Sequence, residues 1–546
     1  MSVAGVLING IRVSVDSDED TILKKAKEKM KRAGISTSTL HFRLYKKSID
    51  ARRREDIRFE CTVLAEGDAL LSLSDAKLAS CDGKRILSEE LSFPTGNEPL
   101  TAPPLIVGMG PAGLFAALLL ARRGYAPVLI DRGGDVLERA RDVEAFKATG
   151  VLNLDSNIQF GAGGAGTFSD GKLITRISDP RCGFVLQALV DFGAPHDILY
   201  KAKPHVGTDV LRTVISNILS EIERLGGSVH YHCRMIAVEE QPDKNLCVKT
   251  TKGDFCAGAL ILAPGHSARD TYAYLIKNSF FVEPKPISVG VRVEHLQRDI
   301  DEALYGRFAG HPNLGPAEYA LSDTKGARGV YTFCMCPGGE VVAAASEEGH
   351  LVVNGMSYHA RDLANANSAV AVSVGCDDYE SVEGSLALGA ISYQRSIERA
   401  AFLAGGEQYF APIMTMGDFL SESRGTEPKR VMPSYRAGKV TLADFQNVFP
   451  SYITESLKYG FTSFSKKLCG YDAGDAVLTA AETRTSAPVR ILRDRETMTA
   501  IGHDRIYPAG EGAGYAGGIT SAAVDGMKAS LALMARFSPS VLSDKT

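Results

Sequence analysis

The sequence lacks any long hydrophobic run. Its longest apolar stretches, such as LFAALLLA at residues 114–121, are far shorter than the about 20 residues that a membrane-spanning helix requires. The first residues, MSVAGVLINGIRVSVDSDED, have no basic segment before the apolar one, and their apolar residues alternate as in a β-strand. We therefore expect no signal peptide and no binding to a membrane.

An excess of charge and a cysteine framework are also missing. The 546 residues carry 61 Lys and Arg against 65 Asp and Glu, a balance that argues against a generally basic nucleic-acid-binding protein. Hydrophobic residues make up 45%, which argues against intrinsic disorder. The ten cysteines are scattered, without disulfide or zinc spacing, and this favours a reducing cytoplasm. We predict a cytoplasmic protein of about two to four domains without a metal site.

Residues 1–98 form the first predicted domain. Strand-like segments and one helix, DEDTILKKAKEKMKRAG (18–34), follow one another in the order β-α-β-β, which predicts a small α+β domain. The basic run KKSIDARRRED (46–56) has the composition of a solvated hairpin tip, and the alternative is an RNA-binding surface. The segment LSFPTGNEPLTAPP (91–104) is typical of a linker.

A dinucleotide-binding fingerprint follows this linker. The apolar strand PLIV (104–107) leads into Gly108-x-Gly110-x-x-Gly113 and an apolar helix. These glycines permit a tight turn, a close approach of the backbone to a diphosphate, and close packing of helix on strand. Asp131 ends the next strand, where a carboxylate can bind a ribose hydroxyl. The cofactor contacts predicted here are Gly108, Gly110, Pro111, Ala112, Gly113, Asp131, Arg132 and Arg139.

The glycine-rich stretch FGAGGAGTFSDGKL (160–173) contains most of a nucleotide-triphosphate P-loop. A true P-loop needs Ser or Thr after its lysine to hold Mg²⁺, and this chain has Leu173 after Lys172. We instead predict that the loop lies along a dinucleotide cofactor, since glycine lets backbone N–H groups approach a ligand closely. Its predicted contacts are Gly163, Gly164 and Gly166, with Lys172 near the flavin or a substrate anion.

The tail YPAGEGAGYAGGITSAAVDG (507–526) indicates FAD rather than NAD. It resembles the closing motif of glutathione-reductase-type flavoproteins, in which an acid binds a ribityl hydroxyl and the next helix points its N-terminus at the flavin. The resemblance puts Glu511 in the place of that acid, and Ala263-Pro264-Gly265 in the place of an Ala-Thr-Gly turn beside FAD. The contacts that it implies are Gly265, Gly510, Glu511, Gly517, Gly518 and Ile519.

Candidates for substrate chemistry are few. Cys334-x-Cys336 places two thiols on one face of a strand, either as a redox pair or as inert core cysteines. Arg484 and Arg490 lie near Glu482. Because arginine binds carboxylates through two parallel hydrogen bonds, an anionic small-molecule substrate is one hypothesis, and ion pairs within the protein are the other. Three histidines are candidate acids or bases: His266, His350 and His359.

The sequence holds no second complete fingerprint of strand, Gly-x-Gly-x-x-Gly, helix, second strand and acid. The pattern Gly-x-Gly-x-x-Gly recurs at 161–166 and 512–517, but both places lack the second strand and its acid. A reductase with its own NAD(P)H domain would normally carry a second complete fingerprint. We therefore expect the flavin to be reduced by the substrate, by NAD(P)H that binds transiently, or by another protein.

Several longer segments resemble one family. They are DRGGDVLERARDVEAFKATGVLNLDSNIQFGAGGAGTFSDGKLITR (131–176), TFCMCPGGEVVAAASEEGHLVVNGMSYHARDLANANSA (332–369) and ETRTSAPVRILRD (482–494). They are similar to the bacterial uncharacterised FAD-dependent dehydrogenases, often labelled NAD(FAD)-utilizing dehydrogenases, which are related to the HI0933-like flavoproteins. The resemblance covers nearly the whole chain. It implies FAD and redox chemistry, and it leaves the substrate open.

Together these observations predict an α/β fold. A glutathione-reductase-type, Rossmann-like FAD-binding domain is assembled from residues 99–290 and 490–546, with an inserted α+β substrate or cap domain at 291–489 and the α+β domain at 1–98. The predicted function is that of an FAD-dependent oxidoreductase, a dehydrogenase or reductase that transfers hydride between flavin N5 and an organic substrate. The alternatives are a flavin-bearing RNA-modification or RNA-binding protein, and a protein that uses FAD only structurally.

Overall fold

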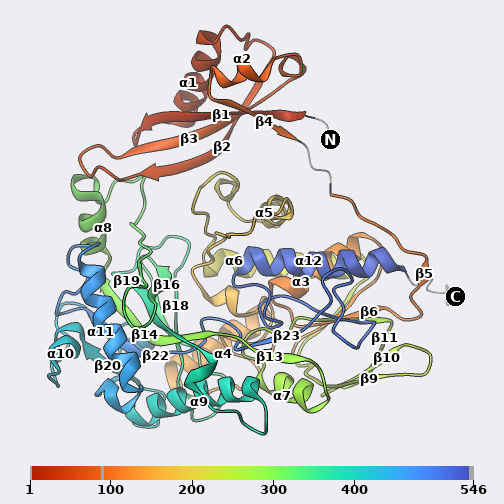
Figure 1. The fold of residues 1–546 in the computed structure, drawn as a ribbon, viewed down its shortest axis with the longest axis vertical. Helices are drawn as coiled ribbons and strands as arrows, with labels where there is room; N and C mark the ends of the chain where they lie inside the picture. Colours follow the sequence, from red (N-terminus) through yellow and green to blue (C-terminus); the bar gives the residue numbers. More distant parts are fainter. Residues whose placement is uncertain (1–2, 88–90, 540–546) are drawn as a thin grey trace.

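The computed structural model describes residues 3–87 and 91–539. Its N-terminal part is an antiparallel sheet of order β2-β3-β1-β4 with two helices packed on it (Figure 1). The elements are β1 (Val3–Ser14), α1 (Glu19–Arg32), β2 (His41–Asp50), β3 (Arg58–Glu66), α2 (Asp75–Ala79) and β4 (Gly83–Leu87). The predicted β-α-β-β order is confirmed, and α2 and β4 complete the sheet. Helix α1 starts where the Asp18 carboxylate accepts from the Thr21 N–H at 2.9 Å.

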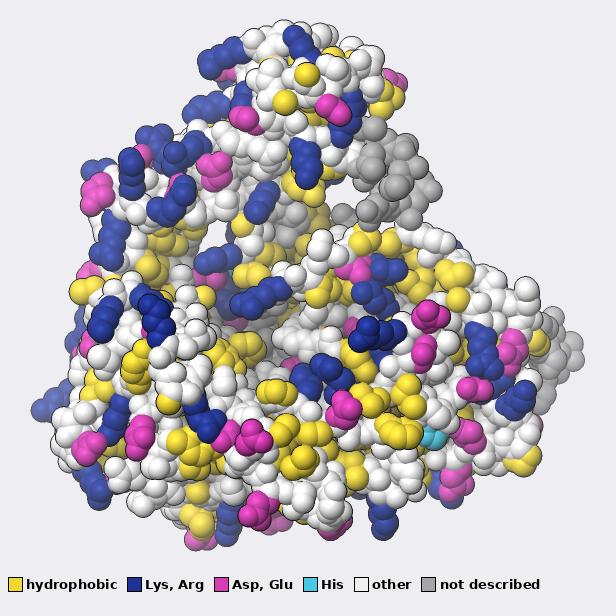
Figure 2. Space-filling model, in the orientation of Figure 1, with side chains coloured by type: hydrophobic (Ala, Val, Ile, Leu, Met, Phe, Trp, Pro, Cys, Tyr) yellow, Lys and Arg dark blue, Asp and Glu magenta, His cyan; other side chains and the backbone are white. Residues whose placement is uncertain are grey.

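The basic run forms the tip of the β2–β3 hairpin. Arg52 pairs with Asp50 at 2.7 Å and Arg58 pairs with Asp56 at 2.8 Å. These arginines are therefore largely compensated by neighbouring acids. The same strand β2 docks on the body of the molecule, because the Lys47 N–H donates to the Tyr200 carbonyl at 2.7 Å. Figure 2 shows a hollow between this domain and the body, with Lys and Arg side chains on its rim.

A five-stranded parallel sheet forms the core of the second part. Its strand order is β24-β12-β6-β7-β8, so its edge strand comes from the end of the chain. The strands are β6 (Pro104–Val107), β7 (Val128–Ile130), β8 (Ser228–His230), β12 (Ala259–Leu262) and β24 (Ile506–Pro508). The predicted Rossmann-like sheet built from distant segments is confirmed.

The two faces of this sheet are covered differently. The Ile106 side chain lies on the face of the sheet that the helices cover, whereas its neighbours Leu105 and Val107 lie on the opposite face. The helical face carries α3 (Pro111–Arg122), α6 (Thr208–Arg224) and α12 (Ile519–Arg536), and α3 lies against both of the others (Figure 1). The opposite face carries an antiparallel sheet of β9 (Met235–Glu240), β10 (Leu246–Thr250) and β11 (Gly253–Ala257). All four residues of β6 are buried, as a two-sided parallel sheet requires.

A seven-stranded sheet dominates the third part, in the order β15-β16-β19-β14-β22-β20-β21. Its strands are β14 (Ile287–Leu296), β15 (Ser322–Asp323), β16 (Val330–Cys336), β19 (Asn365–Val374), β20 (Ala411–Thr415), β21 (Val440–Leu442) and β22 (Val477–Glu482). Helices α9 (Leu386–Ala404) and α11 (Ser451–Ser465) pack on it. The chain then returns to the parallel sheet through β23 (Val489–Ile491), which pairs with β13 (Val282–Pro284).

The linker is held rather than free along the part that the structure describes. The Gly96 N–H donates to the Met534 carbonyl near the end of α12 at 2.7 Å, and β5 (Glu98–Pro99) pairs with β25 (Phe537–Ser538). Residues 88–90 lie outside the described part. Among residues 3–87 and 91–539, no helix combines the length and apolar character needed to cross a membrane.

Candidate functional site

Three glycine-rich segments from distant parts of the chain meet around one cavity. They are the turn after β6, the loop that contains residues 164–172, and the turn that opens α12. Of the residues predicted to contact the cofactor, those that line this cavity are Gly108, Gly110, Pro111, Ala112, Asp131, Gly164, Gly166, Gly265, Glu511, Gly517, Gly518 and Ile519. The large-sheet domain closes the cavity with Phe333, Cys334, Cys336, Asn354 and Arg484.

The turn after β6 requires its glycines. A Cβ on Gly108, where φ is +99°, would lie 2.1 Å from the Ala263 carbonyl oxygen, and one on Gly113 would lie 1.8 Å from the Gly108 oxygen. Asp131 holds the turn, because its carboxylate accepts from the Met109 N–H at 2.9 Å and the Gly133 N–H at 3.0 Å. The first N–H groups of α3 are left open toward the cavity, where an anion can bind.

Five predicted contacts do not line this cavity: Gly113, Arg132, Arg139, Gly163 and Gly510. Arg132 lines a small pocket that shares Gly108, Asp131, Phe160 and Pro264 with the cavity, so its contact with the cofactor stays a prediction. Arg139 is fully buried and donates to the carbonyls of Asn157 and Ile158 at 2.8 Å and of Ala162 at 2.7 Å. It supports the glycine-rich loop, whose buried carbonyls need donors. Arg132 pairs with Asp270 at 2.8 Å.

Gly163 and Gly510 also have structural roles, because their backbone N–H groups hold turns beside the cavity. The Gly163 N–H donates to the Met109 carbonyl at 2.8 Å, and the Gly510 N–H donates to the Asp525 carboxylate at 2.7 Å. Both glycines have positive φ, +89° and +77°. They fix the turns that shape the cavity and do not face it.

The cavity fits a dinucleotide cofactor. A Cβ added to Gly265 or Gly517 would meet no protein atom within 4 Å, so the space beside these backbones is left for a ligand. Two helices, α3 and α12, begin at the cavity and present N–H groups that suit a diphosphate and an electron-rich ring edge. Burial raises the pKa of Glu511 to about 7, and Lys285 opposes this shift.

Lys172 lines the cavity within a network of opposite charges. Its ammonium lies 3.0 Å from Asp170 and 3.4 Å from Glu318, and Arg361 pairs with both acids. Burial alone would lower the pKa of Lys172, but the two carboxylates outweigh it and the pKa is raised. Lys172 is therefore protonated at neutral pH, and its ammonium group is fixed at the cavity wall by these ion pairs.

Cys334 and Cys336 both line the cavity, at a bulge in β16 where Cys334 has φ +42°. The Cys336 thiol donates to the Cys334 carbonyl at 3.2 Å, and the Arg292 guanidinium also donates to that carbonyl. Cys334 is exposed and Cys336 is buried. Desolvation by the surrounding protein raises the pKa of Cys334 to about 12 and that of Cys336 to about 11. Both groups are thus thiols at neutral pH, which disfavours nucleophilic chemistry.

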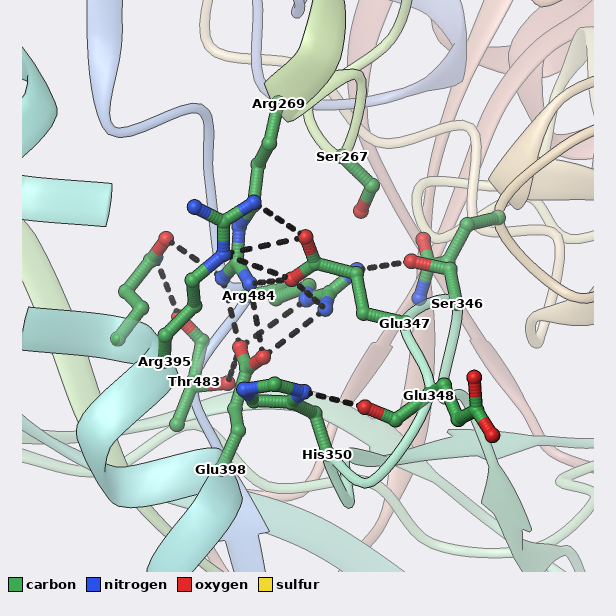
Figure 3. Close-up of polar contacts among 12 residues, drawn as sticks. Ser267, Arg269, Ser346, Glu347, Glu348, His350, Arg395, Glu398, Thr483 and Arg484 are labelled. Atoms are coloured by element: carbon green, nitrogen blue, oxygen red, sulfur yellow. Dashed lines mark hydrogen bonds and ion pairs between the residues drawn. The ribbon is translucent and has the colours of Figure 1, made fainter. Parts of the chain in front are cut away.

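The two candidate arginines of the 482–490 segment lie in different surroundings. Arg484 lines the cavity and is bound by Glu398 and Ser346 (Figure 3). Arg490 is exposed, lies outside the cavity and stacks on Tyr515. The sequence did not reveal Glu398 or Arg269 as partners of Arg484, because they lie in other elements and belong to no motif.

One of the three candidate histidines lines the cavity. His266 is half-buried there, and desolvation and the nearby arginines lower its pKa to about 4. Its Nδ1 lies 2.9 Å from the Ser267 hydroxyl. His350 is bonded to the Glu348 carbonyl and His359 to the Val206 carbonyl, and both lie outside the cavity lining.

Comparisons with known proteins also indicate an FAD-binding protein. A family model described as "FAD-dependent protein, C-terminal domain-like" matches residues 286–485, and a domain of unknown function, DUF8436, matches residues 6–66. An uncharacterized protein of Clostridium beijerinckii (strain ATCC 51743 / NCIMB 8052) is 45% identical over 540 residues, which is 97% of this chain and 99% of the relative.

Solved structures resemble the chain more distantly. CtdE in complex with FAD is 10% identical over 79% of this chain and 83% of its own, with a TM-score of 0.34. Aklavinone-11 hydroxylase with FAD and aklavinone is 13% identical over 80% of this chain and 63% of its own, with a TM-score of 0.32. The predicted relationship to the HI0933-like flavoproteins stays a prediction.

Proposed function

We propose that the chain, which belongs to one family with the Clostridium beijerinckii relative and matches the FAD-dependent C-terminal domain over residues 286–485, is an FAD-dependent oxidoreductase acting on a small organic substrate. The observation that carries the proposal is the meeting of two turns, at Gly110 and at Gly517–Gly518, in one cavity at the starts of two helices. Bound FAD would supply two-electron chemistry by accepting or giving hydride at flavin N5.

Different residues would bind different parts of FAD. The backbone around Gly108 and Gly110 and the start of α3 would hold the diphosphate, and Asp131 keeps that turn in shape. Glu511 and the start of α12 would hold the ribityl chain and the flavin ring. A positive helix end at this position favours electron density on the ring.

The large-sheet domain would hold the substrate. Phe333 would exclude water from its side of the cavity, while Arg484 of this domain and Lys172 of the glycine-rich loop offer fixed positive groups. Ion pairs with neighbouring acids hold both groups, so their positions are set before a substrate binds. The chain has a single complete dinucleotide-binding fingerprint, at residues 104–131, and this supports an electron donor that binds transiently, such as NAD(P)H, rather than one bound in its own domain.

The absorption spectrum of the purified protein tests the proposal. We expect a flavin spectrum and one FAD per chain after heat release, then bleaching by anaerobic photoreduction and reoxidation by an added acceptor. A colourless protein that takes up no FAD would overturn the proposal. FAD that binds but never changes redox state would favour the structural use of FAD.

A further inference from the structure

A cluster of three arginines and two glutamates lies beside the cavity, and we call it the arginine cluster. Its members are Arg269, Glu347, Arg395, Glu398 and Arg484 (Figure 3). They come from α7 (Arg269–Lys277), the segment after β17 (Glu340–Ala343), α9 and the segment after β22. The cluster therefore joins the parallel-sheet domain to the large-sheet domain at the cavity wall.

Glu398 is the centre of the arginine cluster. Its side chain is 0% exposed, and its two oxygens accept from Arg269 at 2.7 and 2.8 Å. The same oxygens accept from Arg484 at 2.9 and 3.1 Å, and Oε1 also accepts from the Thr483 hydroxyl at 2.7 Å. One carboxylate thus fixes the planes of two guanidinium groups.

The buried charges of the arginine cluster balance, because Arg269 and Arg484 face Glu398 and Glu347. The third arginine, Arg395, is half-exposed, so water solvates its charge. Glu347 is shared among Arg269, Arg395 and, at 3.7 Å, Arg484. The neighbouring Glu482 is matched by Arg292 at 2.9 Å, and His266 is neutral at physiological pH because its pKa is lowered. The cluster therefore holds its guanidinium groups in fixed positions without an excess of buried charge.

Arg484 presents its guanidinium group to the cavity. Its side chain is 4% exposed, and it is the member of the cluster that lines the cavity, together with His266 and Thr485. Of the five N–H groups of a guanidinium, three are used here, by the two Glu398 oxygens and the Ser346 hydroxyl. The other two N–H groups, one on each Nη, hydrogen-bond no described residue, and Glu347 Oε2 lies 3.7 Å from Nη2. No described residue hydrogen-bonds His266 Nε2.

We propose that Arg484, with His266 beside it, binds a carboxylate group of the substrate, and that Glu398 and Arg269 are positioning residues for Arg484. The proposal rests on the proposed oxidoreductase function and narrows its substrate to organic carboxylates. A planar guanidinium with two free N–H groups suits the two oxygens of a carboxylate, whereas an amide offers only one acceptor oxygen and no charge.

Ligand pairs test the site without any mutation. Butyrate and butyramide, which differ in charge but little in shape, are titrated into the FAD-loaded protein by calorimetry and by the flavin difference spectrum. We expect butyrate to bind at least about 30-fold more tightly, since a buried charge pair is worth about 2 kcal/mol or more. Equal binding of the two ligands, or no binding of butyrate, would overturn the proposal.

Variants then place the site. Arg484→Gln should remove the preference for butyrate and keep FAD binding, and Arg484→Lys should restore part of it. Arg490→Gln is the matched control, because Arg490 lies outside the cavity, and it should behave as wild type. A preference that survives in Arg484→Gln would overturn the assignment.

The positioning role has its own readout. Glu398→Gln should lower the butyrate-to-butyramide affinity ratio along with the melting temperature, because the Arg484 guanidinium is no longer held. A purely structural role would lower the melting temperature and leave the ratio unchanged, which would remove Glu398 from the proposal. Failure of the wild-type protein to bind FAD counts against the proposed function, whereas FAD binding without carboxylate preference counts against this inference alone.

Discussion

Gly517 offers a way to block the cavity without disturbing the fold. A Cβ at this position would meet no protein atom within 4 Å, and its φ lies outside the left-handed region. Gly517→Val should therefore change the free energy of unfolding of the flavin-free protein by no more than about 0.5 kcal/mol. With FAD bound, the added carbons compete for its space, and overpacking of this kind costs about 1–3 kcal/mol. That range corresponds to roughly 5- to 150-fold weaker FAD binding.

Fluorescence titration of flavin-free protein with FAD measures this change, and thermal unfolding without FAD measures the stability of the fold. Gly183→Val in α5 (Arg181–Asp191) is the control, because a Cβ there also meets no atom within 4 Å but lies away from the cavity. The control should bind FAD as wild type does. Unchanged FAD affinity in Gly517→Val would refute the placement of the cofactor beside this turn.

Three further predictions concern buried groups. Arg139→Ala should lower stability by about 3 kcal/mol or more in urea unfolding, because several buried carbonyls lose their donor. Because the pKa of Glu511 is raised to about 7, stability of the flavin-free protein falls as pH rises from about 4.5 to 7. The Glu511→Gln variant should be about 3 kcal/mol more stable than wild type at pH 8 and as stable as wild type at pH 4.5. If the variant and wild type were equally stable at both pH values, the prediction would be contradicted. With its thiol pKa raised to about 11, the buried Cys336 should react with iodoacetamide at pH 8 at least about 10-fold more slowly than free cysteine, as mass spectrometry can follow.

The cofactor-binding turn could be predicted from the sequence because it depends on residues that are close together along the chain. A Cβ added at Gly108 or Gly113 would lie 2.1 or 1.8 Å from a backbone oxygen, whereas at Gly110 the nearest protein atom would be 3.8 Å away and the room is left for a ligand. These constraints act within one turn or against a strand beside it. The parallel sheet could be predicted for the same reason, since each βα unit carries its own turn and helix signals.

The arginine cluster could not be predicted in this way. Glu398 lies 129 residues from Arg269 and 86 residues from Arg484 along the chain, and no spacing rule links them. Arg139 was predicted to contact the cofactor because it follows the fingerprint, but its surroundings depend on a loop that folds back over it. Pairings of this kind are set by tertiary packing rather than by local pattern.

A crystal structure of the FAD-loaded protein would show directly where the cofactor binds. We expect electron density for one FAD in this cavity, with its diphosphate at the start of α3 beside Gly110 and its ring beside Gly517 at the start of α12. Density for FAD at another place on the molecule, or an ordered cavity that stays free of FAD at saturating concentration, would contradict this expectation.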